Sequence, residues 1–332
     1  MKPSGIFTIS LDFELYWGVR DLLSLREYGR NILGVHQAIP RLLGLFRQYE
    51  IHATWAVVGF LHFRNAAELR QHMPALLPTY RESRFNPYDS LPLLDDASTN
   101  LAHYFAPDLI DAIVGTPHQE LGTHTFSHYY CLEPGQSAEQ FRADLEAAAA
   151  VAEEKTGRRP SSLVFPRNQF NAEYLQLCLE AGVHAVRGNQ RSWSYDPRTL
   201  GRDGPMRRAV RLLDAYVNLT GCHGYPLGGL RPSNGHPAEI PASQFLRPWS
   251  GSLRWLEPLK ERRIKRSLAR CAKRGMLYHL WWHPHNFGAE LEENMQQLHR
   301  ILDHFARLRE RHGMRSLNMS EVSEIIHGQR EQ

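Results

Sequence analysis

The chain of 332 residues contains no apolar run of the ~18 residues that a membrane-spanning helix needs. Its first residues lack the basic stretch followed by an apolar run that marks a secretion signal. It has only four cysteines, without a CxxC spacing or a dense disulfide pattern. These absences lead us to expect a cytoplasmic protein, at most held at the inner face of the membrane.

Repeats and low-complexity tracts are also lacking, and charge of neither sign dominates. The net charge is +4, so nucleic acid is not expected as a partner. With 42% hydrophobic and 22% charged residues, the composition is that of an ordinary soluble globular enzyme. We therefore expect a single catalytic domain over residues 1–332.

What the sequence does contain is a pair of acidic residues near its start. Residues 6–15 are rich in β-branched and aromatic side chains, which predicts a buried strand. Side chains alternate along a strand, so Asp12 and Glu14 should point the same way. Their mutual repulsion is relieved if a cation or a shared proton lies between them, or if both lie at a solvated strand end.

A pair of histidines follows in the middle of the chain. His124 and His128 are four residues apart, so a helical turn or a wide loop can bring both imidazoles to one ion. Gly122 and Ser127 favour a tight loop. Two imidazoles and one carboxylate would leave coordination positions open, as in a catalytic zinc-like site.

The order of four segments resembles the polysaccharide deacetylase (NodB-homology) family, a group of carbohydrate esterases. The resemblance runs from about residue 6 to residue 326 and is dense only in those segments. They are Asp-Phe-Glu at 12–14, Gly-Thr-His-Thr-Phe-Ser-His at 122–128, Phe-Pro-Arg at 165–167 and Leu-Trp-Trp-His-Pro at 280–284.

The resemblance implies a role for each motif residue. Asp12 would be the general base, and Arg167 would hold its carboxylate. A divalent metal ion, zinc above all, would be bound by Glu14, His124 and His128. His283 would be the general acid, although His285 on the other side of Pro284 is an alternative.

The sequence departs from the family pattern at two motifs. Most members have two adjacent aspartates where this chain has Asp-Phe-Glu, so Asp12 could itself be a metal ligand. The usual Arg-x-Pro-aromatic motif is replaced by Arg-Asn-Gln-Phe at 167–170. Aromatic side chains in or after the motifs are candidates for contact with a sugar ring, with core packing as the simpler alternative. These are Trp17, Tyr129, Tyr130 and Trp282.

Strand-like and helix-like segments alternate along the chain, which favours a parallel α/β barrel with catalytic residues at the carboxyl ends of strands. The resemblance implies an irregular (β/α)7-type barrel. Insertions at about 64–118 and 196–256 should cover the catalytic face. Strands are expected at 6–15, 53–59, 119–122, 162–165, 184–186 and 276–282, and helices at 38–49, 136–155, 172–181 and 291–311.

A basic stretch adds information about the substrate. Residues 254–274 contain nine Lys or Arg against two Glu, in a predicted amphipathic helix. Such a helix is a solvated face, or it contacts phosphates or an anionic membrane. The second interpretation suggests an amino sugar linked to a nucleotide or to polyprenyl phosphate, with peripheral membrane contact through 254–274.

The function predicted from these features is metal-dependent removal of an N-acetyl or N-formyl group from an amino sugar or sugar precursor. The reaction would serve surface polysaccharide or lipopolysaccharide biosynthesis. Two alternatives stay open at this point. One is a hydrolase of a non-sugar amide or cyclic ureide, and the other is a sugar-binding protein without catalysis.

Overall fold

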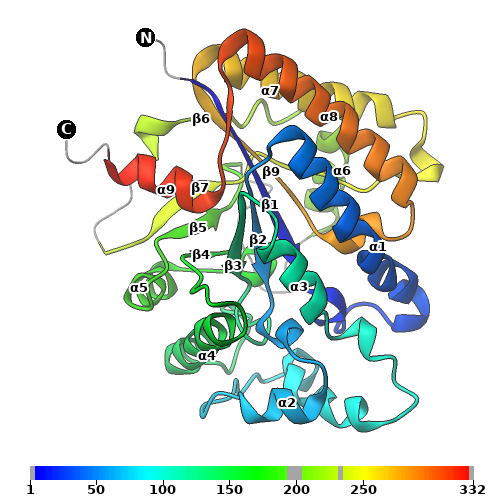
Figure 1. Cartoon of the computed structure of the whole chain (residues 1–332), viewed down its shortest axis with the longest axis vertical. Helices are drawn as coiled ribbons and strands as arrows, with labels where there is room; N and C mark the ends of the chain where they lie inside the picture. The colour runs from blue at the N-terminus through cyan, green and yellow to red at the C-terminus, as the bar shows by residue number, and fades with distance from the viewer. Residues whose placement is uncertain (1–3, 193–203, 231–234, 329–332) are drawn as a thin grey trace.

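A computed structural model describes residues 4–192, 204–230 and 235–328 (Figure 1). One sheet runs through it in the order β6-β9-β1-β2-β3-β4-β5-β7, with β10 beside β1 and β8 beside β9. All pairs are parallel except β6 with β9. The strands are β1 (Ile6–Phe13), β2 (Ala53–Val57), β3 (Gln119–Thr123), β4 (Ser162–Leu163), β5 (Ala185–Gly188), β6 (Tyr225–Pro226), β7 (Ala238–Pro241), β8 (Gln244–Phe245), β9 (Met276–Trp282) and β10 (Arg315–Ser316).

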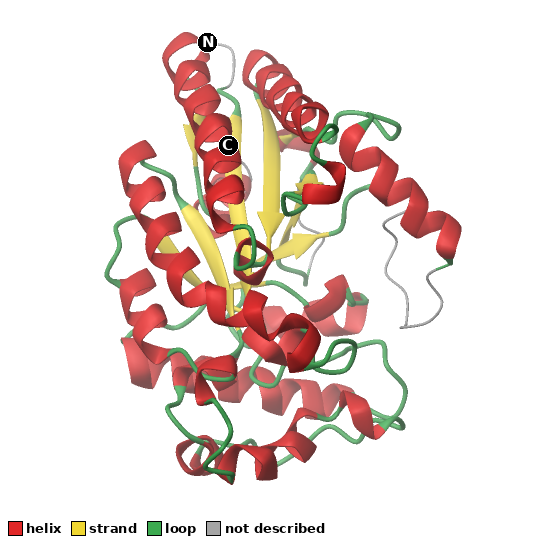
Figure 2. Ribbon diagram, turned by 90° about the vertical axis from the view of Figure 1, so that its right-hand side faces the viewer, coloured by secondary structure: helices red, strands yellow, loops and turns green. Residues whose placement is uncertain are grey.

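The sheet curls into a nearly closed barrel, which confirms the predicted fold class. Between β7 and β8 the chain crosses the gap, because the Ala242 amide donates to Gly188 and the Ser243 amide donates to His279. Figure 2 shows the strands enclosed by helices. The helices are α1 (Leu25–Tyr49), α2 (Ala66–Gln71), α3 (Pro107–Val114), α4 (Ala138–Thr156), α5 (Ala172–Glu180), α6 (Pro205–Tyr216), α7 (Glu257–Arg274), α8 (Leu291–His312) and α9 (Met319–Gly328).

Strand β1 shows how the sequence divides the barrel interior from the helical layer. Every residue of the strand is buried. Its odd-numbered apolar residues, among them Leu11 and Phe13, belong to the main hydrophobic cluster. Ser10 and Asp12 have the opposite parity and contact polar groups inside the barrel. The two-residue period of a strand therefore places apolar residues outward and polar ones inward.

Helix α1 begins earlier than the sequence pattern predicted. It starts after Ser24, whose hydroxyl accepts from the Glu27 amide while Glu27 binds back to Ser24, a capping box. The helix was expected only from residue 38, because Gly34 interrupts the apolar period before that point. Gly34 is required by close packing, since a Cβ there would lie 2.2 Å from the Gly288 carbonyl oxygen.

The two insertions differ from each other. Residues 64–118 form α2, α3 and short 3-10 helices joined by loops, and their role as a cover of the catalytic face stays a prediction. The described part of residues 196–256 contributes α6 and the short strands β6, β7 and β8, which the sequence did not predict, and its role as a cover also stays a prediction. Strands of two to four residues are too short to show an alternating pattern. Parts of this insertion, 196–203 and 231–234, lie outside the described residues. No helix in the described ranges is long and apolar enough to cross a membrane.

Candidate active site

Three predicted metal ligands meet at the carboxyl ends of two central strands. Glu14 follows β1, and His124 and His128 follow β3. The Glu14 Oε2 atom lies 3.3 Å from His124 Nε2 and 3.1 Å from His128 Nε2. All three side chains are buried, and one ligand atom from each lies within 4.8 Å of the others. A carboxylate facing two imidazole nitrogens in this way could hold a metal ion.

The loop that carries the two histidines is held in a strained form. Thr125 and His128 have positive φ angles of 65° and 60°, a region that residues other than glycine rarely adopt. Buried Asp144 of α4 accepts hydrogen bonds from the Phe126 amide at 2.7 Å and from the amide and hydroxyl of Ser127. Burial raises the pKa of Asp144 to about 6. A carboxylate on a helix thus fixes the backbone between the two histidines.

The histidine rings are oriented by their surroundings. His124 Nδ1 lies 2.7 Å from the Val164 carbonyl oxygen, which fixes the ring so that Nε2 faces Glu14. Burial lowers the pKa of His128 to about 4, so this ring is neutral at physiological pH. A neutral imidazole is the form that binds a metal.

Glu14 occupies a space that Gly18 leaves open. A Cβ at Gly18 would lie 2.0–2.4 Å from the Glu14 carboxyl atoms. Burial would raise the pKa of Glu14, but the His283 charge and hydrogen bonds with His124 and His128 lower it well below its usual value. Glu14 is therefore ionised and directed at the two histidines.

The carboxylate of Asp12 is held by Arg187, and the prediction that Arg167 holds it is wrong. Arg187 Nη1 and Nη2 donate to Asp12 Oδ1 and Oδ2 at 2.6 and 2.7 Å, a two-pronged contact in a buried position. Burial would raise the pKa of Asp12, but the Arg187 charge lowers it below its usual value. Because both oxygens of Asp12 are bound by Arg187, Glu14 is the carboxylate that faces the histidines.

Arg167 lies on a different wall of the site. It forms an ion pair with buried Asp21, and its guanidinium lies 4.1 Å from the ring centre of Tyr130. Its own φ angle of 55° is positive, and so is that of Asn168. This turn places the Asn168 Oδ1 atom 3.0 Å from Arg187 Nη2. The segment at 167–168 thus supports the Asp12 pair through Asn168.

Arg187 could have been found in the sequence. It lies in the short buried strand β5 (Ala185–Gly188), directly after two apolar residues. An arginine is unexpected in such a buried strand unless it has a partner. The prediction stopped that strand at residue 186 and passed over the charged residue. No local pattern, however, connects Arg187 with an aspartate 175 positions away.

His283 follows β9 and reaches the same site. Its Nε2 atom lies 3.6 Å from Asp12 Oδ2 and 3.7 Å from Glu14 Oε1, and its side chain keeps 23% of its surface exposed. The neighbouring His285 is buried, and burial lowers its pKa to about 3. The two rings stack with centres 4.9 Å apart. Of the two histidines, His283 is the one that solvent or a substrate can reach.

Three of the four aromatic residues expected to contact a sugar are buried in the core. Trp17 donates to the Tyr104 carbonyl, Tyr129 binds Gln136, and Trp282 stacks on Phe287. Each has at most 1% of its surface exposed, so these predictions are wrong. The fourth, Tyr130, is also buried, but its ring lies 5.1 Å from that of His128 and forms part of the wall of the site.

The tryptophan at the site is Trp281. Side chains of β9 alternate, so Trp281 shares the face of His283 and Trp282 points into the helical layer. The ring of Trp281 lies 4.1 Å from the Arg187 guanidinium and 5.6 Å from the His283 ring. It is only partly buried. Counting in steps of two residues back from His283 along the strand would have identified Trp281, rather than Trp282, as the tryptophan at the site.

A model of the polysaccharide deacetylase family matches residues 32–186. Residues 32–186, a little under half of the chain, are thus similar to the polysaccharide deacetylase family. The matched stretch contains His124 and His128, whereas Asp12, Glu14 and His283 lie outside it and join the site through the fold. Members of the family are metalloenzymes, and the buried group of one carboxylate and two imidazoles fits that chemistry. This similarity supports a deacetylase function. No curated protein matches the sequence.

Several solved structures share the fold of this chain over nearly its whole length. A Mycobacterium smegmatis protein assigned as a polysaccharide deacetylase aligns with a TM-score of 0.60 and 15% identity, over 98% of this chain and 92% of its own. One from Pseudomonas aeruginosa PAO1, with the same assignment, gives 0.57 and 13% over 98% and 92%. The PuuE allantoinase gives 0.56 and 13% over 98% and 91%. At such low identity the likeness concerns the fold alone.

Proposed function

We propose that this protein is a hydrolase that removes an N-acetyl or N-formyl group from an amino sugar with the help of a divalent metal ion. One observation carries the proposal. The buried group of Glu14, His124 and His128 lies beside an Arg-held aspartate and an accessible histidine, Asp12 and His283, at the same end of the barrel.

The residues fit a metal ion, and zinc in particular. Two imidazoles and one carboxylate are the ligand set of many catalytic zinc sites, and they leave positions open for water and substrate. When bound, the ion would lower the pKa of a water molecule and polarise the acyl carbonyl. The structure supports Glu14 as the carboxylate ligand, because Arg187 already occupies both oxygens of Asp12.

The remaining residues would move the protons. Asp12, kept ionised by Arg187, accepts a proton from the attacking water as its oxygen bonds to the acyl carbon. His283 donates a proton to the sugar nitrogen as the carbon–nitrogen bond breaks. The products are a free amino sugar and acetate or formate. General acid–base groups typically contribute ~100- to 10,000-fold each to such a reaction.

The substrate we propose carries a phosphate, as an amino sugar linked to a nucleotide or to polyprenyl phosphate. The basic residues at 254–274 favour such a carrier over a neutral polymer. A substrate of this kind would place the enzyme in the cytoplasm, at the stage where precursors of surface polysaccharide or lipopolysaccharide are made.

A substrate panel tests the proposed reaction class. The zinc-loaded protein would be incubated with N-acetyl and N-formyl amino-sugar nucleotides and with a cyclic ureide, and released acetate or formate would be measured together with ureide loss. We expect acid release from an amino sugar, and none from the Asp12→Asn variant. Ureide hydrolysis alone, or sugar binding without turnover, would contradict the proposal.

A further inference from the structure

Helix α6 turns an apolar face outward. Met206, Leu213 and Val217 follow one another at helical spacing and keep 71%, 56% and 53% of their surfaces exposed. Its polar side faces α7, where buried Asp214 pairs with Arg263 at 2.9 Å. Eight of the thirteen large apolar residues that are exposed in the described part of the chain lie between 206 and 259. An exposed apolar area of this kind marks an interaction site.

The neighbouring helix α7 adds a row of positive charge. Arg262, Arg266 and Arg270 are four residues apart and exposed, so they lie along one face of the helix. Like charges at this spacing destabilise a helix unless an anion lies near them. Leu259, with 41% of its surface exposed, lies on the same face. The row extends over about 12 Å, longer than one phosphate group can span.

The acidic residues near this row bind other cations. Lys260 pairs with Glu257 at 2.5 Å, and Lys265 and Arg300 pair with Glu261. Within the ranges that the structure describes, Arg262, Arg266 and Arg270 form no ion pair. The cations of α7 that are buried or half-buried are thus neutralised by partners, whereas the exposed arginines are not.

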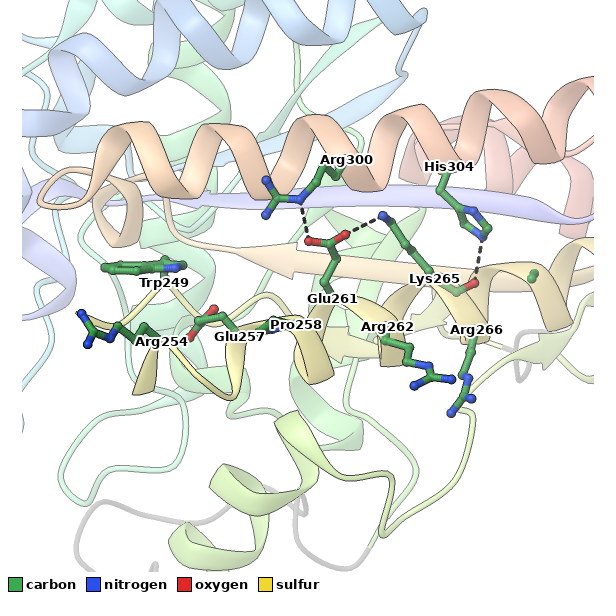
Figure 3. Close-up of a pocket in the computed structure, with 11 residues that line it drawn as sticks. Trp249, Arg254, Glu257, Pro258, Glu261, Arg262, Lys265, Arg266, Arg300 and His304 are labelled. Carbon is green, nitrogen blue, oxygen red and sulfur yellow. Dashed lines mark hydrogen bonds and ion pairs between the residues drawn. The ribbon is translucent and has the colours of Figure 1, made fainter. Parts of the chain in front are cut away.

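Two hollows lie on either side of these arginines. One of about 700 Å³ is lined by Trp249, Arg254 and Arg300, and one of about 320 Å³ is lined by Asn218 and Arg270. Arg262 and Arg266 line both. Figure 3 shows that their guanidinium groups point away from Glu261 and Arg300. Glu257 and Glu261 also line the larger hollow, but both pair with other cations, and among the described residues no carboxylate lines the smaller hollow. Arg262 and Arg266 can therefore donate to an anionic group.

We propose that this face docks on the surface of an anionic phospholipid membrane. The apolar residues of α6 would enter the boundary between headgroups and acyl chains, while the α7 arginines bind lipid phosphates. Trp255, 80% exposed beside the row, suits the interfacial layer. A nucleic acid would contact the α7 arginines but leave the apolar residues of α6 exposed. A free phosphate is too small to contact all three arginines, and it would not contact α6.

The docking surface is connected to the active site along the chain. Phe245 of β8 packs on Trp281 with ring centres 4.7 Å apart, and the chain runs from there through Trp255 into α7. Docking would hold the enzyme at a membrane that carries lipid-linked amino sugars, a consequence that rests on the proposed function. Membrane binding itself does not require catalysis.

Flotation with vesicles tests the charged part of the surface. We expect the protein to float with phosphatidylglycerol-containing vesicles but not with phosphatidylcholine alone, and raised salt should weaken binding. The triple variant R262E/R266E/R270E should bind at least about tenfold more weakly, since each basic residue contributes about fivefold. The matched control reverses three exposed arginines elsewhere, in R26E/R47E/R81E, and should bind as the wild type does. Equal losses in both variants, or no binding to anionic vesicles, would overturn the proposal.

A second pair of variants tests the apolar part. Leu213→Ser with Val217→Ser should weaken flotation severalfold, while Leu76→Ser with Leu93→Ser, two residues exposed elsewhere, should not. Short duplex DNA that binds as tightly as vesicles, unaffected by the α6 changes, would identify a general polyanion site and contradict membrane docking. Acyl release from an N-acyl amino sugar without a phosphate carrier should be unchanged in the Leu213→Ser/Val217→Ser variant, so loss of docking and loss of catalysis are measured separately.

Discussion

At the scale of single residues, the pair of Asp12 and Arg187 decides whether the site has a working base. Arg187 supplies both the charge that lowers the pKa of Asp12 and the geometry that fixes its carboxylate. Arg187 is itself positioned by Ser10 and Asn168 and covered by Trp281. The base is thus part of a buried network, and its removal should affect the chemistry more than the fold of the site loops.

Replacement of Arg187 by methionine tests this role. We expect Arg187→Met to lower kcat/KM about 100- to 10,000-fold, because the base loses its charged partner. The acid limb of the pH–rate profile should move to higher pH, since the positive charge that lowers the Asp12 pKa is gone. Arg167→Met is the matched control, and it should cost less and leave the acid limb in place. Equal losses in the two variants would contradict the assignment.

Gly18 gives a second test at this scale. Gly18→Ala should displace the Glu14 carboxylate, because the added Cβ would lie within 2.4 Å of all three carboxyl atoms. We expect zinc affinity to fall at least about tenfold, measured by calorimetry. Gly44→Ala, where no atom lies within 4 Å of the new Cβ, should leave affinity unchanged and stabilise α1 slightly. Unchanged zinc affinity in Gly18→Ala would show that Glu14 is not a ligand.

Buried His62 makes the protein sensitive to acid. Burial and the Lys155 charge lower its pKa from 6.5 to about 4. The unfolded chain therefore binds this proton at a higher pH than the folded protein does. The contribution of His62 to stability is complete above pH 6.5 and is lost as the pH falls towards 4, by about 2 kcal/mol at pH 5.

His62→Gln should remove that part of the pH dependence. Denaturant unfolding between pH 7.5 and pH 5 should show a loss of unfolding free energy that is about 2 kcal/mol smaller in the variant than in the wild type. A lower stability of the variant at neutral pH does not affect this comparison of slopes. Parallel curves for the two proteins would mean that His62 is protonated alike in the folded and unfolded states.

At the scale of elements, two-residue alternation along strands explains much of what the sequence could predict. It predicted that Asp12 and Glu14 lie on one side of β1. The order of strands and helices along the chain predicted that all four motifs lie at strand ends. The same rule applied to β9 selects Trp281 with His283, and ignoring it led to the choice of Trp282. Arg187 was missed for a different reason, because strand pairing over 175 residues, rather than a local period, brings it to Asp12.

The histidine loop depends on an element outside the motifs. Asp144 of α4 should act as a positioning residue for His124 and His128. Asp144→Ala would leave the Phe126 and Ser127 amides without an acceptor in the interior, at a cost of about 2 to 4 kcal/mol. We expect both the unfolding free energy and zinc affinity to fall, with added zinc restoring part of the stability.

The surface variant Asp108→Ala is the control for that change. Asp108 pairs with Arg64, but its side chain is 77% exposed, so its loss should alter stability by less than about 0.5 kcal/mol. If Asp144→Ala destabilises the protein but binds zinc as the wild type does, the loop is not held in its ligating form by Asp144.

At the scale of the whole molecule, the barrel gathers residues from the entire chain at one end. Glu14, His124, Arg187 and His283 belong to four strands or the loops that follow them, and β1 lies in the middle of the sheet. The alternation of strands and helices predicted this arrangement in outline. The closure by β7 and β8 and the outward apolar face of α6 could not be predicted, because both depend on contacts between segments far apart in the sequence.

The central claim is that Glu14, His124 and His128 hold a metal ion that this site uses to remove an acyl group. The most direct test compares acetate or formate release from an N-acyl amino-sugar nucleotide by the chelated protein, by the same protein after zinc is restored, and by Asp12→Asn with zinc bound. We predict no release by the chelated protein, release after zinc is added, and none from Asp12→Asn although it binds zinc as tightly. Full activity of the chelated protein, or zinc binding that survives replacement of both His124 and His128 by asparagine, would contradict the account.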